Sequence, residues 1–133
     1  MVTTAGRAAV ITVVQLQVPE GNVRVPIHEF ELVWTDAERL FREDPQSRYI
    51  GGLCAACRWV AGHPDALSPL HRTKVRADEE SIARENVLAN MTYLVVPEGD
   101  PAVHPDWAAG VALTLGWVRG VLPDSPLGGS RPI

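Results

Sequence analysis

Residues 49–62 read YIGGLCAACRWVAG, and a related stretch, WAAGVALTLGWVRG, occupies residues 107–120. Aligned without gaps, the two stretches share two glycines, a tryptophan and a valine, which are Gly52, Trp59, Val60 and Gly62 in the first copy and Gly110, Trp117, Val118 and Gly120 in the second. Each stretch is followed by a Pro-Asp pair and a Ser-Pro-Leu triplet. We interpret this similarity as an internal repeat that arose by duplication or by convergent packing.

The spacing within each copy predicts a helix with an apolar side, because its large apolar residues recur every three to four positions. A glycine inside a helix costs about 1 kcal/mol relative to alanine. A glycine at the same place in both copies therefore indicates that close backbone approach or ring packing compensates for this cost. The aromatic residues have two interpretations, a helix–helix core or a symmetric pocket or groove for a partner. In the second interpretation the candidate binding residues are Trp59, Trp117, Tyr49 and Trp107.

The two cysteines of the chain, Cys54 and Cys57, form a C-x-x-C motif in the first copy. The second copy has Ala112 and Leu115 at these positions, which favours two small buried apolar side chains. Two chemical alternatives stay open. One is a redox dithiol; the other is a zinc site made by Cys54, Cys57, His63 and His71. We expect no cofactor.

The N-terminal part of the sequence predicts a β-hairpin over residues 9–34. Val14, Leu16 and Val18 alternate with glutamines, as in a strand with one buried side. The PEGN sequence at 19–22 is typical of a turn. The second apolar run begins at Val23 and changes its alternation near His28, which we interpret as a bulge.

Helices are expected after the hairpin. A capping box at Thr35–Glu38 predicts the start of a short helix that reaches about Glu43. Asp44-Pro45 predicts the start of a second helix, which carries the first copy of the repeat and ends near Gly62. A third helix is expected from about Asp78, and a fourth from about Pro105 to Gly120. The predicted apolar side of the third helix consists of Ile82, Val87, Leu88, Met91 and Leu94.

Together these elements predict an α+β fold that is mainly helical: an N-terminal β-hairpin followed by about four helices, arranged as two pseudo-symmetric helix pairs. We expect one domain over residues 1–133. Its parts are the hairpin (9–34), a first helical unit (35–70), a second helical unit (77–127) and a flexible tail (128–133).

Composition narrows the class of function. With a formal net charge of -4 and no extended basic stripe, the chain is not expected to bind nucleic acid or a membrane. The opening sequence lacks the pattern of a secretory signal, so we expect a cytoplasmic protein. One basic run, His71 to Arg76, could hold a phosphate or an acidic partner. Because Asp78-Glu79-Glu80 follow directly, we favour a solvated loop neutralised by those acids.

No complete catalytic motif is present, and tryptophan is enriched at interaction hot spots. We therefore predict a small non-catalytic protein-binding or assembly module, such as an accessory subunit or regulator. It would act through a helical face or the hairpin edge, with a protein partner or as a homo-oligomer. The alternative is a small-ligand-binding or thiol- or metal-dependent enzyme that uses Cys54, Cys57 and a pocket between the repeated helices.

Overall fold

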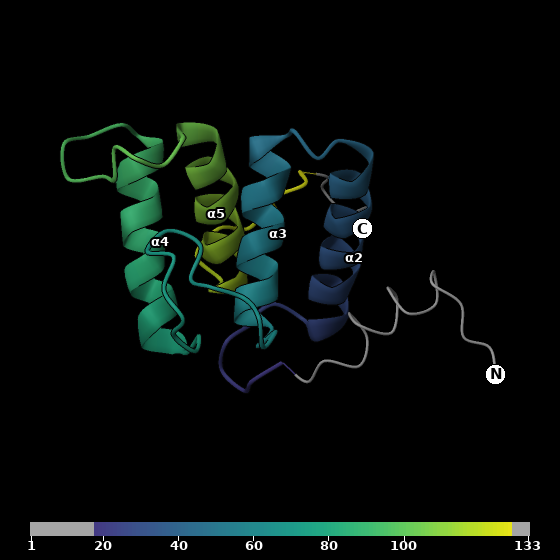
Figure 1. The fold of residues 1–133 in the computed structure, drawn as a ribbon. Coiled ribbons are helices and arrows are strands. Elements are labelled where there is room, and N and C mark those ends of the chain that lie inside the picture. Colours follow the sequence, from purple (N-terminus) through teal and green to yellow (C-terminus); the bar gives the residue numbers. More distant parts are fainter. Residues whose placement is uncertain (1–17, 129–133) are drawn as a thin grey trace.

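The computed structural model describes residues 18–128, which form four α-helices (Figure 1). They are α2 (Ile27–Glu43), α3 (Arg48–Val60), α4 (Glu79–Tyr93) and α5 (Pro105–Val118). The helices stand side by side in the order α4, α5, α3, α2, and the two central helices run in the same direction. The interface between α3 and α5 is the largest, while α2 packs on α3 and α4 packs on α5.

The mainly helical character is confirmed, but the predicted β-hairpin (9–34) is wrong. Residues 9–17 of the expected first strand lie outside the described residues. Pro19 to Asn22 do make a turn, closed by a 3.2 Å hydrogen bond from the Asn22 amide to the Pro19 carbonyl. No strand follows it anywhere in residues 18–128, and α2 begins at Ile27 instead.

The physical reason lies in the period of the apolar residues. Phe30, Trp34 and Ala37 are four and three positions apart, and all three are buried on the inner side of α2. Leu32, between them, is exposed. The change of alternation that suggested a bulge is therefore the three-to-four-residue period of a helix. Pro26 is the N-cap of α2, where its missing amide hydrogen has no cost.

Two predicted helix starts also need correction. Thr35 and Glu38 lie in the middle of α2, where Glu38 forms two hydrogen bonds of 2.7 Å with the Arg58 guanidinium. The N-cap of α3 is Ser47, which accepts a hydrogen bond from the Ile50 amide at 3.2 Å, and not Asp44. A capping box forms at the first turn of a helix, where the amides are free, but α2 begins upstream of Thr35, at Ile27.

The starts of the last two helices agree with the prediction. Asp78 is the N-cap of α4 and forms a capping box with Ser81, with bonds of 2.8 and 2.9 Å. Pro105 is the first residue of α5, directly after its N-cap His104. The Asp78 side chain accepts a hydrogen bond from a free amide of the first turn, and Pro105 has no amide hydrogen that would need an acceptor.

The two central helices touch through their glycines, and the contact is reciprocal. A Cβ atom built on Gly52 would lie 2.2 Å from the carbonyl oxygen of Trp107. One built on Gly110 would lie 2.2 Å from the carbonyl oxygen of Tyr49. In the sequence repeat Gly52 is equivalent to Gly110 and Tyr49 to Trp107, so equivalent residues of the two copies make the two contacts. Only glycine permits this approach.

The two copies also end alike. Gly62 and Gly120 have φ of 84° and 78°, and their amides bond to the carbonyls of Trp59 and Trp117 at 3.0 and 2.9 Å. This is the usual helix ending at a glycine in the left-handed region. The part of the repeat shared by both copies therefore encodes a helix contact and a helix end.

The core lies between the four helices and includes most of the repeat. Its largest fully buried side chains come from α2, α3, α4 and α5 and from the loop before α4; they are Trp34, Trp59, Phe30, Leu53, Leu70, Ile82 and Leu115. None of the helices in residues 18–128 combines the length and apolar character needed to cross a lipid bilayer.

Candidate functional site

The four aromatic residues predicted as binding residues lie at two depths. Trp59 and Trp117 are 2% and 4% exposed and belong to the core. Tyr49 and Trp107 are partly buried and pack against the edge of the core. The indole nitrogens of two of these residues bind loop carbonyls. Trp59 Nε1 donates to the Val75 carbonyl at 2.8 Å, and Trp107 Nε1 donates to the Pro69 carbonyl at 3.0 Å. The Tyr49 hydroxyl donates to the carbonyl of Pro126.

Cys54 and Cys57 are free thiols, and both are buried on α3. Burial, and then the negative charge of Glu38, raise the pKa of the Cys54 thiol to about 12. Burial raises the pKa of Cys57 well above its ordinary value, and the neighbouring Cys54 adds to this effect. Reactive thiols have the opposite character, with a lowered pKa and solvent access.

The two histidines of the zinc hypothesis are engaged elsewhere. His63 Nδ1 accepts a hydrogen bond from the Asp65 amide at 3.1 Å, and His71 Nδ1 lies 2.5 Å from Glu85 Oε1. Across residues 18–128 the structure contains no group of three or more His, Cys, Asp or Glu side chains placed to hold a metal ion. The structure therefore does not bring Cys54, Cys57, His63 and His71 together as a ligand set.

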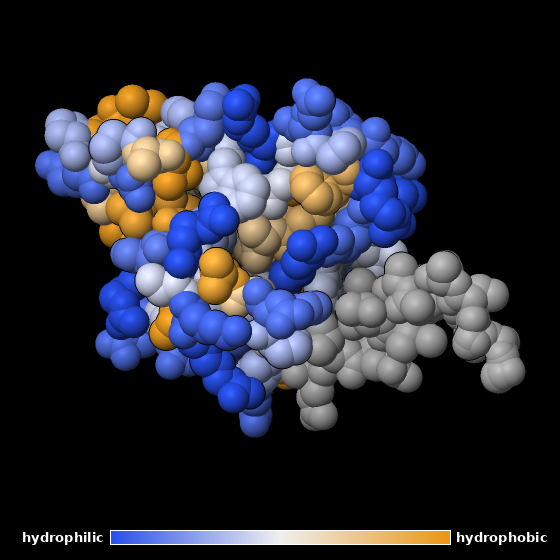
Figure 2. Space-filling model, in the orientation of Figure 1, coloured by the Kyte–Doolittle hydropathy of each residue, from blue (hydrophilic) through white to orange (hydrophobic). Residues whose placement is uncertain are grey.

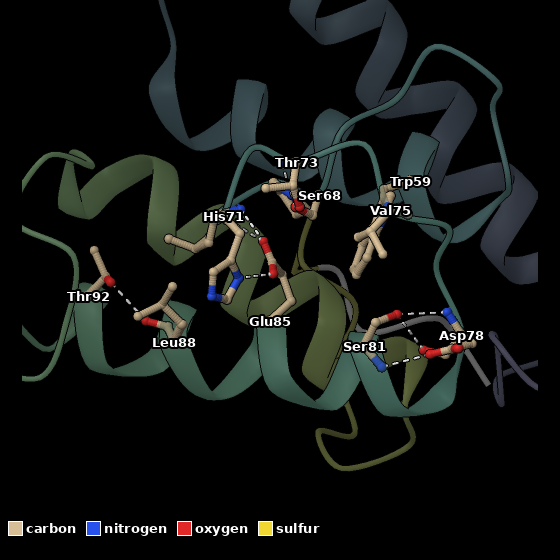
Figure 3. A network of polar contacts seen from close by, with 12 residues as sticks. Trp59, Ser68, His71, Thr73, Val75, Asp78, Ser81, Glu85, Leu88 and Thr92 are labelled. Atoms are coloured by element: carbon tan, nitrogen blue, oxygen red, sulfur yellow. Dashed lines mark hydrogen bonds and ion pairs between the residues drawn. The ribbon is translucent and has the colours of Figure 1, made fainter.

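A buried carboxylate on α4, which the sequence reasoning missed, fixes the loop between α3 and α4. Glu85 accepts hydrogen bonds from the amides of Leu70 and His71, the second at 2.8 Å, and pairs with the His71 ring (Figure 3). Within the same loop, Ser68 Oγ bonds to Thr73 Oγ1 at 3.0 Å. The sequence contained an indication that Glu85 is buried, because residues three positions apart lie on the same side of a helix and Glu85 follows the apolar Ile82 at that spacing.

The predicted apolar side of α4 is largely wrong. Of its members only Ile82 is buried; Val87 and Leu94 are 54% and 66% exposed, and Leu88 and Met91 are partly buried. The inner side of α4 instead contains several polar residues, which are Ser81, Glu85, Asn86 and Thr92.

These inner polar groups have partners. Asn86, with its amide oriented to satisfy both ends, donates to the Ala112 carbonyl at 3.3 Å and accepts from Arg119 at 2.9 Å. Thr92 Oγ1 donates to the Leu88 carbonyl at 2.8 Å and accepts from the Asp100 amide at 2.9 Å. Buried polar groups are tolerated when their hydrogen bonds are made, so α4 can pack on α5 through this side.

The opposite side of α4 is left with apolar residues facing solvent. We name this surface the α4 outer face and define it by Ala83, Val87, Asn90, Met91, Leu94 and Val95. Figure 2 shows apolar colouring gathered over α4 and the segment that follows it. Val95, which follows the C-cap Leu94, is also exposed.

No family model, curated protein or solved structure significantly matches this chain.

Proposed function

We propose that this protein is a protein-binding module that assembles with a second copy of itself through the α4 outer face. The observation that supports this proposal is the exposure of Val87 and Leu94 on a helix whose inner side is already packed on α5. No catalytic step is part of the proposed function.

The chemistry of the α4 outer face suits a protein interface. Removing apolar surface from water is favourable by about 25 cal/mol per Å², and contiguous exposed apolar patches mark interaction sites. From Asn86 to Pro97 the sequence contains no charged side chain. A partner that covers this surface from Val87 onward therefore does not have to desolvate a charge there, and Arg84, beside Ala83, is already paired with Glu80.

The order of residues along α4 favours a second copy as that partner. Residues 83, 87, 90/91 and 94 follow one side of the helix at the spacing of its turns. If two α4 helices pair in opposite directions, the small Ala83 of one copy lies beside the large Leu94 of the other, and Val87 lies beside Asn90. Small residues facing large ones let two helices approach closely, and a single Asn in such a contact favours one register.

The direct experiment measures the mass of the full chain in solution by light scattering after size exclusion. We expect a dimer for the unaltered protein and a monomer for Val87→Glu/Leu94→Glu, because two carboxylates would be buried without partners in the interface. The circular dichroism spectrum should be unchanged, since both side chains face solvent in the isolated monomer.

The matched control is Leu32→Glu, on the exposed side of α2 at 55% exposure, which should remain a dimer. A monomeric unaltered protein would contradict the proposal. So would a dimer that survives Val87→Glu/Leu94→Glu, or a different protein that binds the α4 outer face in place of the second copy.

The alternative function, a thiol- or metal-dependent enzyme, has less support. Its two thiols are buried with raised pKa values, and its four candidate ligands do not form one cluster in the described part of the chain. The hairpin edge, which was the other predicted binding surface, is replaced by the first half of α2.

A further inference from the structure

Three cations occupy alternate positions in the loop between α3 and α4: Arg72, Lys74 and Arg76. All three are exposed. Arg72 lies over the ring of Trp107, with its guanidinium carbon 5.8 Å from the ring centroid. Among residues 18–128, Lys74 and Arg76 have no acidic side chain within ion-pair distance.

The acidic residues that follow in the sequence do not neutralise these cations, in contrast to our expectation. Asp78 caps α4 through Ser81. Glu79 pairs with Arg24 at 3.2 Å, and Glu80 pairs with Arg84, one helical turn along α4, at 3.3 Å. The loop is solvated, as expected, but the acids that follow it bond to other residues, so Lys74 and Arg76 have no paired carboxylate within the segment that the structure describes.

Two of the cations line a pocket of about 360 Å³ between the end of α3 and the loop. Its walls come from residues 59–66 and 74–77, and the side chains that matter for binding are Trp59, His63, Pro64, Lys74, Val75 and Arg76. No acidic side chain is among the residues that line the pocket. The volume falls in the range of pockets for small ligands, roughly 300–1,000 Å³.

The backbone that carries Lys74 and Arg76 is held in place on both sides of Arg76. Trp59 Nε1 binds the Val75 carbonyl at 2.8 Å. Buried Asn22 binds the Ala77 carbonyl at 3.0 Å and, with the same amide nitrogen, the Val60 carbonyl at 2.9 Å. A ligand would therefore meet a preformed cationic wall and would not have to order the loop.

The end of α3 also presents few competing acceptors to these cations. Its carbonyls at Arg58 and Trp59 are bonded to the amides of His63 and Gly62, both at 3.0 Å. His63 contributes a donor. Since its Nδ1 accepts from the Asp65 amide, a neutral ring has its proton on Nε2.

We propose that this pocket binds the phosphate group of a small organic phosphate monoester. The phosphate would lie between Lys74 and Arg76, because charge-assisted hydrogen bonds from Lys and Arg are the strong contacts that phosphate makes in proteins. The organic part would lie against the apolar wall made by Trp59, Pro64 and Val75. This site is separate from the α4 outer face and does not depend on self-association.

Nuclear magnetic resonance of the ¹⁵N-labelled full chain provides the test, with phenyl phosphate as the probe. The Trp59 indole N–H and the Gly62 amide should shift saturably with probe concentration, while the Trp34 indole should not. Phenol and inorganic phosphate, added separately at matched ionic strength, should each bind at least about tenfold more weakly, because each lacks one of the two recognised parts.

Lys74→Gln/Arg76→Gln should weaken phenyl phosphate binding by more than about tenfold. The matched control is Arg39→Gln/Arg84→Gln, which removes two exposed cations from α2 and α4 and should leave binding unchanged. The proposal is overturned if the Trp59 signal does not saturate, or if both double variants weaken binding equally. Tighter binding of a single-stranded oligonucleotide than of phenyl phosphate would also overturn it, in favour of a nucleic-acid site.

Discussion

At the scale of single residues, the sequence predicted the packing of Cys54 and Cys57 but not the full cause of the raised pKa of Cys54. The repeat aligns them with Ala112 and Leu115 and so predicted two small buried apolar side chains. Both thiols are buried in the structure. What the sequence could not predict is the proximity of Glu38, which comes from another helix. Its charge adds to burial in raising the pKa of Cys54.

The raised pKa of Cys54 predicts a pH-dependent stability. In the folded protein the thiol stays protonated up to a pKa of about 12, whereas its ordinary value is 9.0. The folded state thus holds its proton more tightly. This stabilisation is fully present below the unfolded pKa and is lost as pH rises through the folded pKa. Between about pH 8 and about pH 10.5 the free energy of unfolding should fall more for the unaltered chain than for Cys54→Ala.

Urea unfolding followed by tryptophan fluorescence measures this difference. Alanine is the residue that the second copy of the repeat has at the equivalent position, so the substitution should be accommodated with little rearrangement. Identical pH dependence in the two proteins would contradict the raised pKa.

At the scale of elements, the sequence predicted helix starts well where a capping residue or a proline stands directly before or at the first turn, as for α4 and α5. It failed for α2, where a short apolar run fits both a strand and a helix. It also failed for the orientation of α4. The inner side of that helix contains Glu85 and Asn86, whose burial depends on partners in the loop and on α5. Polar residues are read as exposed unless those distant partners are known.

The contact between α3 and α5 predicts that Gly110→Ala destabilises the protein. The added methyl would overlap the Tyr49 carbonyl oxygen at 2.2 Å, and backbone cannot move aside as a side chain can. Overpacking of this kind costs about 1–3 kcal/mol, which should appear as a lower urea midpoint with an unchanged slope.

Gly116→Ala is the matched control on the same helix. There the new methyl would meet only the side chain of Leu122, at 2.7 Å, and that side chain can turn away. Alanine also favours a helix interior over glycine by about 1 kcal/mol. Gly116→Ala should therefore be clearly more stable than Gly110→Ala, and equal midpoints for the two variants would contradict the close contact.

At the scale of the whole molecule, the two proposed sites lie at different places. The pocket is at the C-terminal end of α3, whereas the α4 outer face extends to the C-terminal end of α4, at the opposite end of the helices (Figure 1). Of the pocket, the repeat contains only Trp59 and Gly62, and the cations Lys74 and Arg76 lie outside both copies, as does the whole α4 outer face.

This separation predicts independent behaviour. Val87→Glu/Leu94→Glu should bind phenyl phosphate with the affinity of the unaltered chain, measured by the same Trp59 signal. Lys74→Gln/Arg76→Gln should keep the mass of the dimer in light scattering. A loss of both properties in either variant would show that the two sites are coupled.

The reciprocal glycine contact also limits how the molecule can move. Each glycine forms a notch that receives a carbonyl group of the neighbouring helix. A slide by one helical turn, about 5.4 Å, would place the Trp107 carbonyl against Ala56 in one direction and the Tyr49 carbonyl against Thr114 in the other, and neither residue leaves room for a carbonyl as glycine does. Axial sliding of α3 past α5 is thus blocked in both directions by the same pair of contacts. We therefore expect the two central helices to move as one unit along their axes.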